Sequence, residues 1–387
     1  MSGQRAHVVV IGGGYAGIAA ANRLRRRTDI EITLVNPRPE FVERIRLHQL
    51  AAGTGSATAA YDSLLGADVR LVVDTAERID TASRTVELST GTGLVYDYLV
   101  YAVGSTAATA SSVPGVDEYA YPIAELEQAD RLRETLATLP PDSPIVVVGA
   151  GLTGLETAAE LAERGRSVQL LCGGVLGPSL SAPGRRSVAG RLARLGVEVL
   201  ETAVVTEVRA DAVVLGDSTV LPSAVTIWTA GFGVPGLARA SGLRTDALGR
   251  LITDETLTSI DDDHIIAAGD AAAPSGHPLR MSCQAAIPLG TQAADTVLSR
   301  LTGDRPTSID QAFIGSCVSL GRHGGIIQAA RRDDTAVDIF LAGRMAAAFK
   351  EAVCRSTLWQ LRRAAVKPGS SLWLKGGRRI THAEQTV

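Results

Sequence analysis

The chain has 387 residues, enough for two or three domains with separate hydrophobic cores. Its 45% hydrophobic and 20% charged residues are typical of a soluble globular protein, and a net charge of −3 gives no sign of an acidic partner such as nucleic acid. Neither a secretory leader nor an apolar run of ~18–20 residues, the length of a membrane span, is recognisable. We therefore expect a cytoplasmic protein. No C-x-x-C or metal-ligand spacing relates its cysteines, so we expect no metal site: Cys172, Cys283, Cys317 and Cys354.

A segment near the N-terminus recurs in the middle of the chain. Residues 7–17 read HVVVIGGGYAG, and residues 145–154 read IVVVGAGLTG. In both copies an apolar run leads through glycines into an alanine-rich helical stretch, and a second apolar run follows, at residues 30–35 and 168–171. Continuous apolar runs of this kind are typical of buried parallel strands. The repeat predicts two βαβ units and an α/β fold.

Proline and glycine residues mark further boundaries along the chain. Shorter strand-like runs lie at residues 69–73 and 85–88, and another segment spans residues 98–104. Ser111-Ser112-Val113-Pro114-Gly115 predicts a crossing between domains, and residues 252–260 predict a crossing back. The composition changes again after about Arg305. The expected segments are 1–112, 113–252, 253–305 and 306–387.

The first glycine loop has the spacing of a dinucleotide site. In Gly12-x-Gly14-x-x-Gly17 the first glycine allows the tight turn, the second admits a pyrophosphate and the third lets helix and strand pack closely. Asn36 ends the next strand at the usual spacing of ~20 residues, where an acidic residue usually binds the ribose. Its amide can also bind a hydroxyl, helped by Arg38. The alternative is that Asn36-Pro37 is only a turn.

The second loop, Gly149-x-Gly151-x-x-Gly154, has the same spacing. Cys172 stands where a site specific for NAD would carry a carboxylate, so the 2′-phosphate of NADPH is not repelled there. This slightly favours NADPH or dual use. Arg185 and Arg186 either reach that phosphate or are solvated loop residues.

Three further motifs complete a resemblance. They are residues 96–105 (YDYLVYAVGS), residues 227–231 (IWTAG) and residues 265–270 (IIAAGD). With the two glycine loops, in this order, they resemble the two-dinucleotide-binding-domain flavoproteins of the pyridine nucleotide–disulphide oxidoreductase superfamily over residues 6–302. The last motif is similar to the flavin-ribityl motif of that family, which implies that Asp270 accepts a hydrogen bond from a ribityl hydroxyl.

The resemblance implies two Rossmann-like domains and two cofactors. FAD would bind segments 1–112 and 253–305, NAD(P)H would bind 113–252, and 306–387 would form a small C-terminal interface and basic tail. The residues implied for FAD are Gly12, Gly14, Tyr15, Ala16, Gly17, Asn36, Arg38, Arg46, Ala102, Gly104, Gly269, Asp270, Gln284 and Ala285. Those implied for the nicotinamide nucleotide are Gly149, Gly151, Leu152, Thr153, Gly154, Cys172 and Gly231. No metal ligand is expected.

The positions of the cysteines indicate which type of chemistry within this superfamily is expected. Disulphide reductases carry a redox cysteine pair after the first βαβ unit or within the nicotinamide domain, but residues 41–48 and 149–160 contain no cysteine. Dithiol chemistry is therefore disfavoured. Arg46 and His48 are expected either to face the flavin, where a cation favours its anionic reduced form, or to lie on a solvated helix face.

Without a dithiol, the chain resembles the type II NADH:quinone dehydrogenases and apoptosis-inducing-factor-like quinone reductases. The former carry Ala-Gln-x-Ala-x-Gln at the quinone pocket, and the matching stretch is Cys283-Gln284-Ala285-Ala286-Ile287-Pro288. Gln284 fits this pattern, whereas Pro288 replaces the second glutamine. We expect Pro288 in the first turn of a helix that runs to about Leu301 and points its positive end at the flavin. Cys283 is expected to be a packing residue.

Three residues are the candidates for catalysis: Glu156, Gln284 and Arg46. By resemblance Glu156 lies near the nicotinamide, although a glutamate there can also simply stabilise the helix dipole. No conventional acid–base pair is expected, because a flavin performs hydride chemistry itself.

The C-terminal segment at residues 345–366 predicts an amphipathic helix, followed by Lys367, Lys375, Arg378 and Arg379. Either it contacts a membrane surface, in which case the protein is peripheral on the cytoplasmic face, or it packs on the FAD domain or on a second subunit of a homodimer. The function expected is an FAD-dependent NAD(P)H dehydrogenase that passes electrons to a quinone or another small acceptor. The alternatives are a soluble reductase of a pathway intermediate or protein carrier, and a flavin-binding redox sensor.

Overall fold

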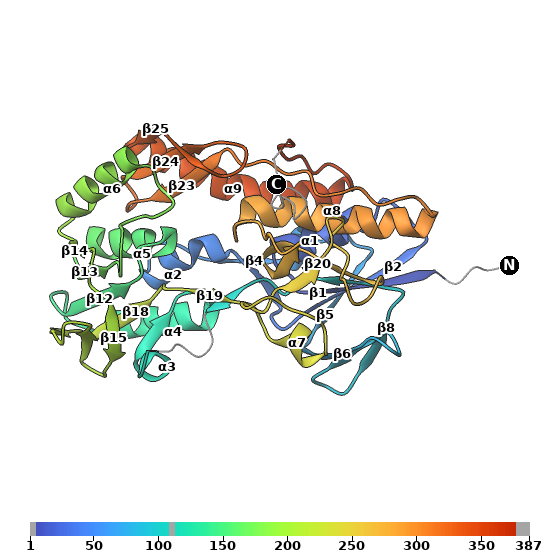
Figure 1. The fold of residues 1–387 in the computed structure, drawn as a ribbon, viewed down its shortest axis with the longest axis horizontal. Helices are drawn as coiled ribbons and strands as arrows, with labels where there is room; N and C mark the ends of the chain where they lie inside the picture. The colour runs from blue at the N-terminus through green and yellow to red at the C-terminus, as the bar shows by residue number, and fades with distance from the viewer. Residues whose placement is uncertain (1–4, 108–112, 377–387) are drawn as a thin grey trace, which may run out of the picture.

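The computed structural model describes residues 5–107 and 113–376. The start of the expected crossing, Ser111-Ser112, and the tail arginines Arg378 and Arg379 lie outside these residues. Two sheet units lie side by side, and a C-terminal layer spans both (Figure 1). The mixed α/β architecture predicted from the repeat is confirmed.

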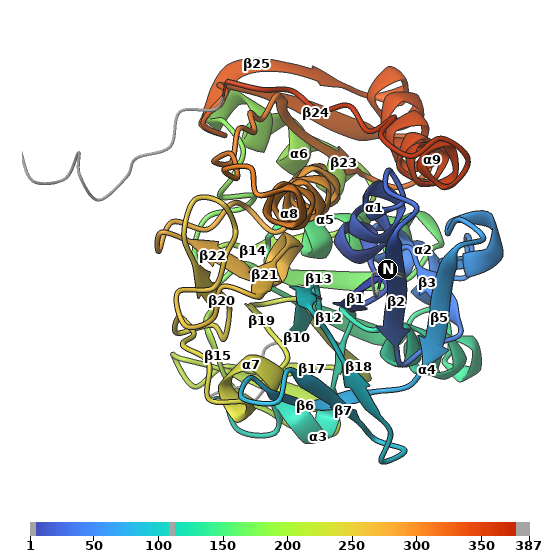
Figure 2. The ribbon, with the colours of Figure 1, turned by 90° about the vertical axis from the view of Figure 1, so that its right-hand side faces the viewer.

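The first unit is built on a five-stranded parallel sheet in the order β21-β9-β1-β2-β5. The strands β21, β9, β1 and β2 are largely buried on both faces, as continuous hydrophobic runs require, whereas the edge strand β5 is partly exposed. Helices α1 and α8 pack against each other beside this sheet (Figure 2). The bounds are β1 Ala6–Ile11, α1 Tyr15–Leu24, β2 Ile30–Asn36, β5 Val69–Val73, β9 Tyr98–Tyr101, β21 Ile265–Ala267 and α8 Cys283–Thr302.

The second unit repeats this plan with a five-stranded parallel sheet in the order β11-β18-β12-β13-β14. In each sheet, the strand before the glycine loop lies between the strand that follows its helix and a strand from later in the chain. Such a reversal of strand order creates a crevice at the carboxyl ends of the strands, where ligands bind. The bounds are β11 Ala120–Pro122, α4 Leu126–Thr138, β12 Pro144–Val148, α5 Leu152–Glu163, β13 Ser167–Leu171, α6 Ala182–Arg194, β14 Glu198–Leu200 and β18 Val225–Trp228.

Smaller elements decorate and connect the two units. The antiparallel pair of β10 (Thr106–Ala107) and β19 (Phe232–Gly233) joins the segment that follows β9 to the segment that follows β18. The remaining bounds are β3 Glu40–Val42, η1 Arg44–Arg46, α2 Leu47–Ala51, β4 Thr58–Ala60, η2 Tyr61–Ser63, β6 Ala76–Asp80, β7 Thr85–Leu88, β8 Gly93–Val95, α3 Val116–Tyr119, β15 Val205–Val208, β16 Ala212–Leu215, β17 Val220–Pro222, α7 Leu237–Ala240, β20 Leu251–Thr253, η3 Gly269–Ala271 and β22 Ala272–Pro274.

The C-terminal layer consists of an antiparallel sheet and one long helix. The sheet contains β23 (Gly315–Ser319), β24 (Gly325–Ala330) and β25 (Ala336–Ala342), and the helix is α9 (Arg344–Val366). Helix α9 packs on α1 and on β23 and β24, so it lies along both units. This confirms the predicted amphipathic helix. Its buried side chains repeat every three or four residues: Ala346, Lys350, Cys354, Thr357, Leu361 and Ala364.

Helix α8 departs from one expectation. Pro288 is the sixth residue of this helix and therefore lies in its second turn, so its expected place in the first turn was wrong. A proline there has no N–H to donate to the carbonyl of Gln284, four residues earlier. The side chain of Gln311 compensates, because its Nε2 donates to that carbonyl at 2.7 Å. The helix thus tolerates the proline through a contact from a distant loop.

Candidate active site

The first glycine loop is shaped by close backbone contacts. Gly12 has φ +103°, and a Cβ atom on it would lie 2.2 Å from the carbonyl oxygen of Ala102. A Cβ on Gly17 would lie 1.8 Å from the oxygen of Gly12, so helix α1 packs directly against the loop. Gly14, in contrast, faces open space and caps α1 without any side-chain hydrogen bond. The positive end of α1 therefore faces a space in which a pyrophosphate fits.

The second loop reproduces this geometry. Gly149 has φ +102°, and a Cβ on it would lie 2.8 Å from Thr229 Oγ1, while one on Gly154 would lie 1.8 Å from the Gly149 oxygen. Gly151 again faces open space at the uncapped start of α5. By comparison, α6 and α8 each begin with a serine whose side chain accepts a backbone hydrogen bond. The two glycine-loop helices thus keep their N–H groups for a ligand.

Asn36 supports the first loop through both halves of its amide. Its Oδ1 accepts from Gly13 N at 2.9 Å, and its Nδ2 donates to Arg38 O at 2.8 Å. Tyr61, which sequence reasoning missed, donates to the Gly13 carbonyl at 2.9 Å. The guanidinium of Arg38 points to helix α4, where it binds Glu127 and Glu125 at 2.6 and 3.0 Å. Asn36 and Arg38, both predicted to bind the ribose, therefore make these contacts within the protein.

Three segments that are far apart in the sequence meet beside Gly14: the start of α1, η3 and the start of α8. A Cβ on Gly269 would lie 2.9 Å from the Cβ of Ala16 and 3.8 Å from that of Ala286, and one on Gly290 would lie 2.0 Å from Ala16 O. The predicted residues Tyr15 and Ala16 at the start of α1, Gly269 and Asp270, and Gln284 and Ala285 at the start of α8 therefore border one region.

Asp270 belongs to a hydrogen-bond chain that the sequence did not reveal. Its Oδ2 accepts from Ser105 Oγ at 2.7 Å, and Ser105 Oγ accepts from Arg44 Nη1 at 2.8 Å. Arg44 also donates to the carbonyl of Ala124 at 3.1 Å, in the second unit. Gly104 lies beside this guanidinium, since a Cβ on it would be 3.9 Å from Arg44 Nη1. Arg44 thus connects the ribityl-like motif to the neighbouring domain.

Arg46 and His48 are not on a solvated helix face, so that alternative was wrong. His48 is only 3% exposed. The guanidinium of Arg46 binds Glu43 at 3.2 Å and Glu351 on α9 at 3.0 Å. Burial disfavours its charge, but the hydrogen bonds and charges of these carboxylates outweigh burial and raise the pKa of Arg46.

A buried charge cluster lies where the two units meet the C-terminal layer. Glu156 is 7% exposed, and its Oε1 lies 3.1 Å from Lys350 Nζ and accepts from Ser319 N at 3.0 Å. His48 Nδ1 lies 3.7 Å from Glu156 Oε2. Glu156 therefore does more than stabilise the dipole of α5, because it balances a lysine brought by another layer.

The protonation states of this cluster follow from its burial and pairing. Burial opposes both charges, but the Lys350–Glu156 attraction outweighs it, which lowers the pKa of Glu156 and raises that of Lys350. Burial lowers the pKa of His48 to about 4, with Lys350 adding to the effect. The cluster thus holds one cation, one anion and a neutral imidazole at neutral pH.

Three cysteines that are far apart in the sequence surround this lysine. Cys283, Cys317 and Cys354 are free, and each thiol interacts electrostatically with Lys350. Burial is the main cause of their raised pKa values, to about 12 for Cys354. Sequence separation had suggested no relation among them. Protonated buried thiols are poor nucleophiles, which agrees with packing roles.

The remaining predicted residues border the second loop. Leu152 and Thr153 open α5, Cys172 follows β13, and Gly231 follows β18. Burial raises the pKa of Cys172 to about 11, and the nearby carboxylate of Glu201 adds to it. Glu201, the residue after β14, therefore places a carboxylate near position 172. On α6, Arg185 donates to Leu180 O at 3.2 Å.

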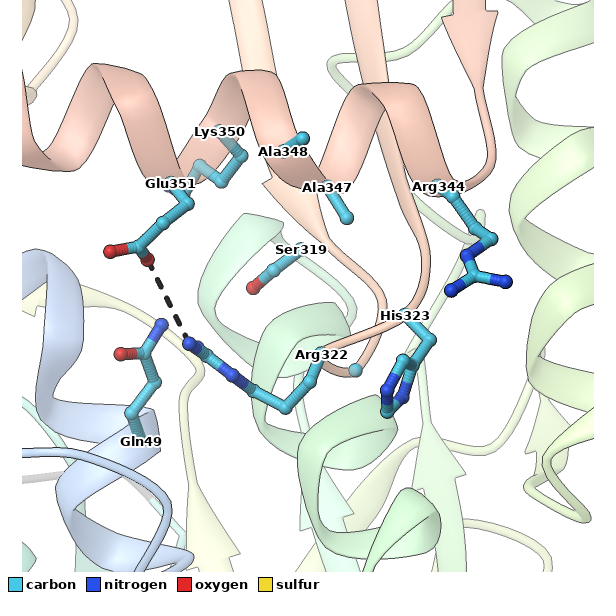
Figure 3. A pocket seen from close by; sticks show the side chains of 10 residues that line it. Gln49, Ser319, Arg322, His323, Arg344, Ala347, Ala348, Lys350 and Glu351 are labelled. Carbon is cyan, nitrogen blue, oxygen red and sulfur yellow. Dashed lines mark ion pairs between the residues drawn. The ribbon is translucent and has the colours of Figure 1, made fainter.

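A cavity of about 350 Å³ opens beside the charge cluster (Figure 3). Its walls are the start of α9, the turn between β23 and β24, and Gln49 of α2. Glu163 of α5 holds that turn by accepting from Arg322 N and pairing with His323 at 3.4 Å. The ionisable lining residues are Arg322, His323, Arg344, Lys350 and Glu351.

Lys350 is the main residue that sequence reasoning missed. It lies on the stripe of α9 that is otherwise apolar or small, and a lysine within such a stripe needs a buried partner. That signal was available, whereas its partner Glu156 could be found only from the fold. Within the described ranges, no helix has the length and apolar character needed to cross a membrane.

Comparisons with known proteins agree with this geometry. Residues 6–290 match the family model described as pyridine nucleotide-disulphide oxidoreductase. An NADH dehydrogenase-like protein of Mycobacterium tuberculosis is 30% identical over 349 residues, covering 82% of this chain and 86% of its own. A type II NADH:quinone oxidoreductase of Staphylococcus haemolyticus is 27% identical, covering 84% and 90%.

Among solved structures, the sulfide:quinone oxidoreductase of Aquifex aeolicus aligns with a TM-score of 0.81 at 22% identity, covering 94% of this chain and 93% of that one. This likeness concerns the fold. The family match spans most of the chain and includes both glycine loops and the ribityl-like motif. The chain therefore belongs to the pyridine nucleotide-disulphide oxidoreductase family, and it is an FAD-dependent NAD(P)H oxidoreductase.

Proposed function

We propose that the protein oxidises NAD(P)H through FAD and passes the electrons directly to a small quinone-type acceptor. The observation that carries this proposal is the buried Lys350 cation, which binds Glu156 next to His48; these two residues lie in the stretches 149–160 and 41–48, which contain no redox cysteine pair. A fixed cation suits direct reduction of an acceptor, because it stabilises negative charge that develops during electron transfer. Relatives named as quinone oxidoreductases support this acceptor class.

FAD is assigned to segments 1–112 and 253–305, and the nicotinamide nucleotide to 113–252. The open faces of Gly14 and Gly151 support one pyrophosphate at each helix start. Asp270 is assigned to a ribityl hydroxyl, and Gln284 and Ala285 to the flavin edge at the start of α8. The other predicted loop residues are retained as contacts of these two nucleotides.

When bound, FAD supplies the hydride chemistry, accepting two electrons and a proton from NAD(P)H and releasing them to the acceptor. The chain contributes position and electrostatics. Glu156 fixes the ammonium of Lys350 and keeps it charged, while Ser319 and His48 satisfy the remaining polar atoms of the cluster. Arg46 acts in this scheme by clamping α9 to the first unit through Glu351. A quinone takes up two protons on reduction, and the second must reach it from water.

The outer face of α9 supports a contact with a membrane surface. Met345, Phe349, Trp359 and Val366 fall on one stripe, with exposed fractions of 73%, 49%, 57% and 87%. Arg363 lies over the Trp359 ring at 5.2 Å, within a run of basic residues. Apolar and basic side chains on one face suit anionic lipid, so binding to anionic vesicles should weaken as salt rises.

Stopped-flow absorbance tests the proposed function. Purified yellow protein is mixed with NADH or NADPH under anaerobic conditions and then with a soluble naphthoquinone. Rapid bleaching of the flavin followed by rapid recovery is the expected result. Bleaching without recovery by the quinone would support instead the reductase of a pathway intermediate or protein carrier. Absence of bleaching by either nucleotide would refute hydride transfer and favour a redox sensor.

A further inference from the structure

The cavity beside Lys350 is lined by more cationic than anionic side chains. Arg322, Arg344 and Lys350 line it together with a single carboxylate, that of Glu351. This carboxylate is already engaged, since Arg46 and Arg355 each bind it at 3.0 Å and Arg322 lies 3.8 Å away. The hydrogen bond from Arg46 is the main cause of its lowered pKa. Glu156 balances Lys350 and three arginines share Glu351, so among the described residues Arg344 has no carboxylate partner.

Two further donors face the same space. Gln49 is buried, and its Oε1 accepts from Arg46 at 3.0 Å, but in the described part of the chain its Nε2 donates to no acceptor. The 23-residue helix α9 begins at the cavity, with no side-chain cap and no acidic residue in its first turn. The helix dipole thus adds positive potential where Arg344 already stands. Figure 3 shows Arg344 at one end of the cavity, under the start of α9, and Gln49 with the Arg322 guanidinium at the other.

The cavity also lies next to the proposed flavin edge. Lys350 lines it and interacts electrostatically with the thiol of Cys283, which precedes Gln284 and also interacts with Asp270. Lys350 is therefore a residue of the cavity wall that acts electrostatically on the start of α8, the segment assigned to FAD. Its volume of about 350 Å³ is at the small end of ligand pockets, enough for a compact bicyclic molecule.

We propose that this cavity receives the electron acceptor and selects a quinone-type molecule that carries an anionic group, such as a carboxylate or sulfonate. This inference rests on the proposed function and narrows its acceptor class. The anionic group binds Arg344 at the start of α9, where the helix dipole adds to the attraction, and the ring lies toward Arg322, Gln49 and Lys350. Guanidinium groups suit this role because they bind carboxylates and sulfonates through two parallel hydrogen bonds.

Isothermal titration of the oxidised FAD-loaded enzyme, without nucleotide, tests the inference apart from turnover. The probes are a naphthoquinone and its sulfonated analogue. We expect tighter binding of the sulfonate, and we expect Arg344→Gln to weaken it about tenfold while changing the neutral quinone less than about twofold. Arg344 has no ion-pair partner among the residues that the structure describes, so this variant should fold normally.

Arg355→Gln is the matched control. The arginine that it removes lies on the same helix as Arg344. It binds Glu351 but does not line the cavity, so sulfonate affinity should be retained. Equal affinity for both quinones, or equal losses in the two variants, would overturn the inference. Stopped-flow reduction by NADH and reoxidation by the neutral quinone are measured in parallel. If these succeed while charge selectivity is absent, the proposed function stands and only the inference fails.

Discussion

Lys350 Nζ lies 3.1 Å from Glu156 Oε1, and this buried pair joins the C-terminal helix to the helix that follows the second glycine loop. Removing one partner leaves the other charge buried and uncompensated, which typically costs about 3–5 kcal/mol. We expect Lys350→Met to lower the free energy of unfolding by about 3 kcal/mol, measured in urea. The double variant Lys350→Met/Glu156→Gln should regain most of that loss. Equal stability of single and double variants would contradict the pairing.

His48 should make the protein sensitive to mild acid. Its pKa is lowered to about 4 by burial, from 6.5 in the unfolded chain, so between these values the unfolded state binds more protons than the folded state. Stability is therefore full above pH 6.5 and falls as pH drops toward 4. Glu156, whose pKa is lowered, acts in the same direction at lower pH.

The measurement for this prediction is the melting temperature of wild type and His48→Gln between pH 7 and 4.5. The wild type should lose about 1–3 kcal/mol more than the variant over that range. His7→Gln is the control, because that histidine is only half-buried and lies on β1, away from the cluster. Parallel pH profiles for wild type and His48→Gln would exclude a role for His48.

Gln311 and Pro288 should be energetically coupled. Gln311→Met removes the donor that satisfies the Gln284 carbonyl, and an unpaired buried carbonyl costs about 1–3 kcal/mol. In a Pro288→Ala background the helix regains an N–H for the same carbonyl, so the cost of Gln311→Met should fall to less than half. A double-mutant cycle in urea measures this coupling. Additive effects would mean that the two residues act independently.

The second glycine loop should control nucleotide binding selectively. Gly149→Ala places a methyl group at positive φ and 2.8 Å from Thr229 Oγ1, and should weaken NADH binding at least about tenfold without loss of FAD. Gly165→Ala is the control, because Gly165 also has positive φ but meets no atom within 4 Å. That variant should lose about 1 kcal/mol of stability and keep its NADH affinity. Flavin absorbance and NADH titration report the two cofactors separately.

Glu201 should favour NADH over NADPH. Its carboxylate lies near Cys172, where the ribose of a nucleotide on α5 is expected, and would repel a 2′-phosphate. Glu201→Gln should therefore raise the ratio of flavin reduction rates with NADPH and NADH about fivefold to tenfold. Glu198→Gln, at the first residue of β14 and three residues before Glu201, is the control. An unchanged ratio in Glu201→Gln would contradict this role of Glu201. The weak preference for NADPH inferred from Cys172 would then stand.

Local patterns predicted much of this molecule. The strands at residues 69–73 and 85–88 begin and end where their apolar runs do, and both glycine loops precede helices as their spacing requires. These signals are local, because alternating burial and tight turns depend on neighbouring residues. Pro288 was placed wrongly because its helix begins one turn earlier, at a serine cap whose strength the sequence alone did not reveal.

Contacts between layers could not be predicted in the same way. The Lys350–Glu156 pair, the Arg44 bridge and the grouping of three cysteines depend on how the C-terminal layer crosses two distant units. Periodicity assigns a residue to a face but does not identify what that face meets. The sequence therefore predicted the two glycine loops well and the contacts around Lys350 poorly.

The close approach of Gly290 to Ala16 has a consequence for the order in which the chain folds during synthesis. Helix α1 is among the first elements to leave the ribosome, yet the helix that covers it, α8, and the edge strand β21 come after all strands of the second sheet. The unit encoded in the middle of the chain can close while the first one still exposes an apolar helix face. FAD uptake must then await the late segment, so a nascent chain is most vulnerable to aggregation in this interval.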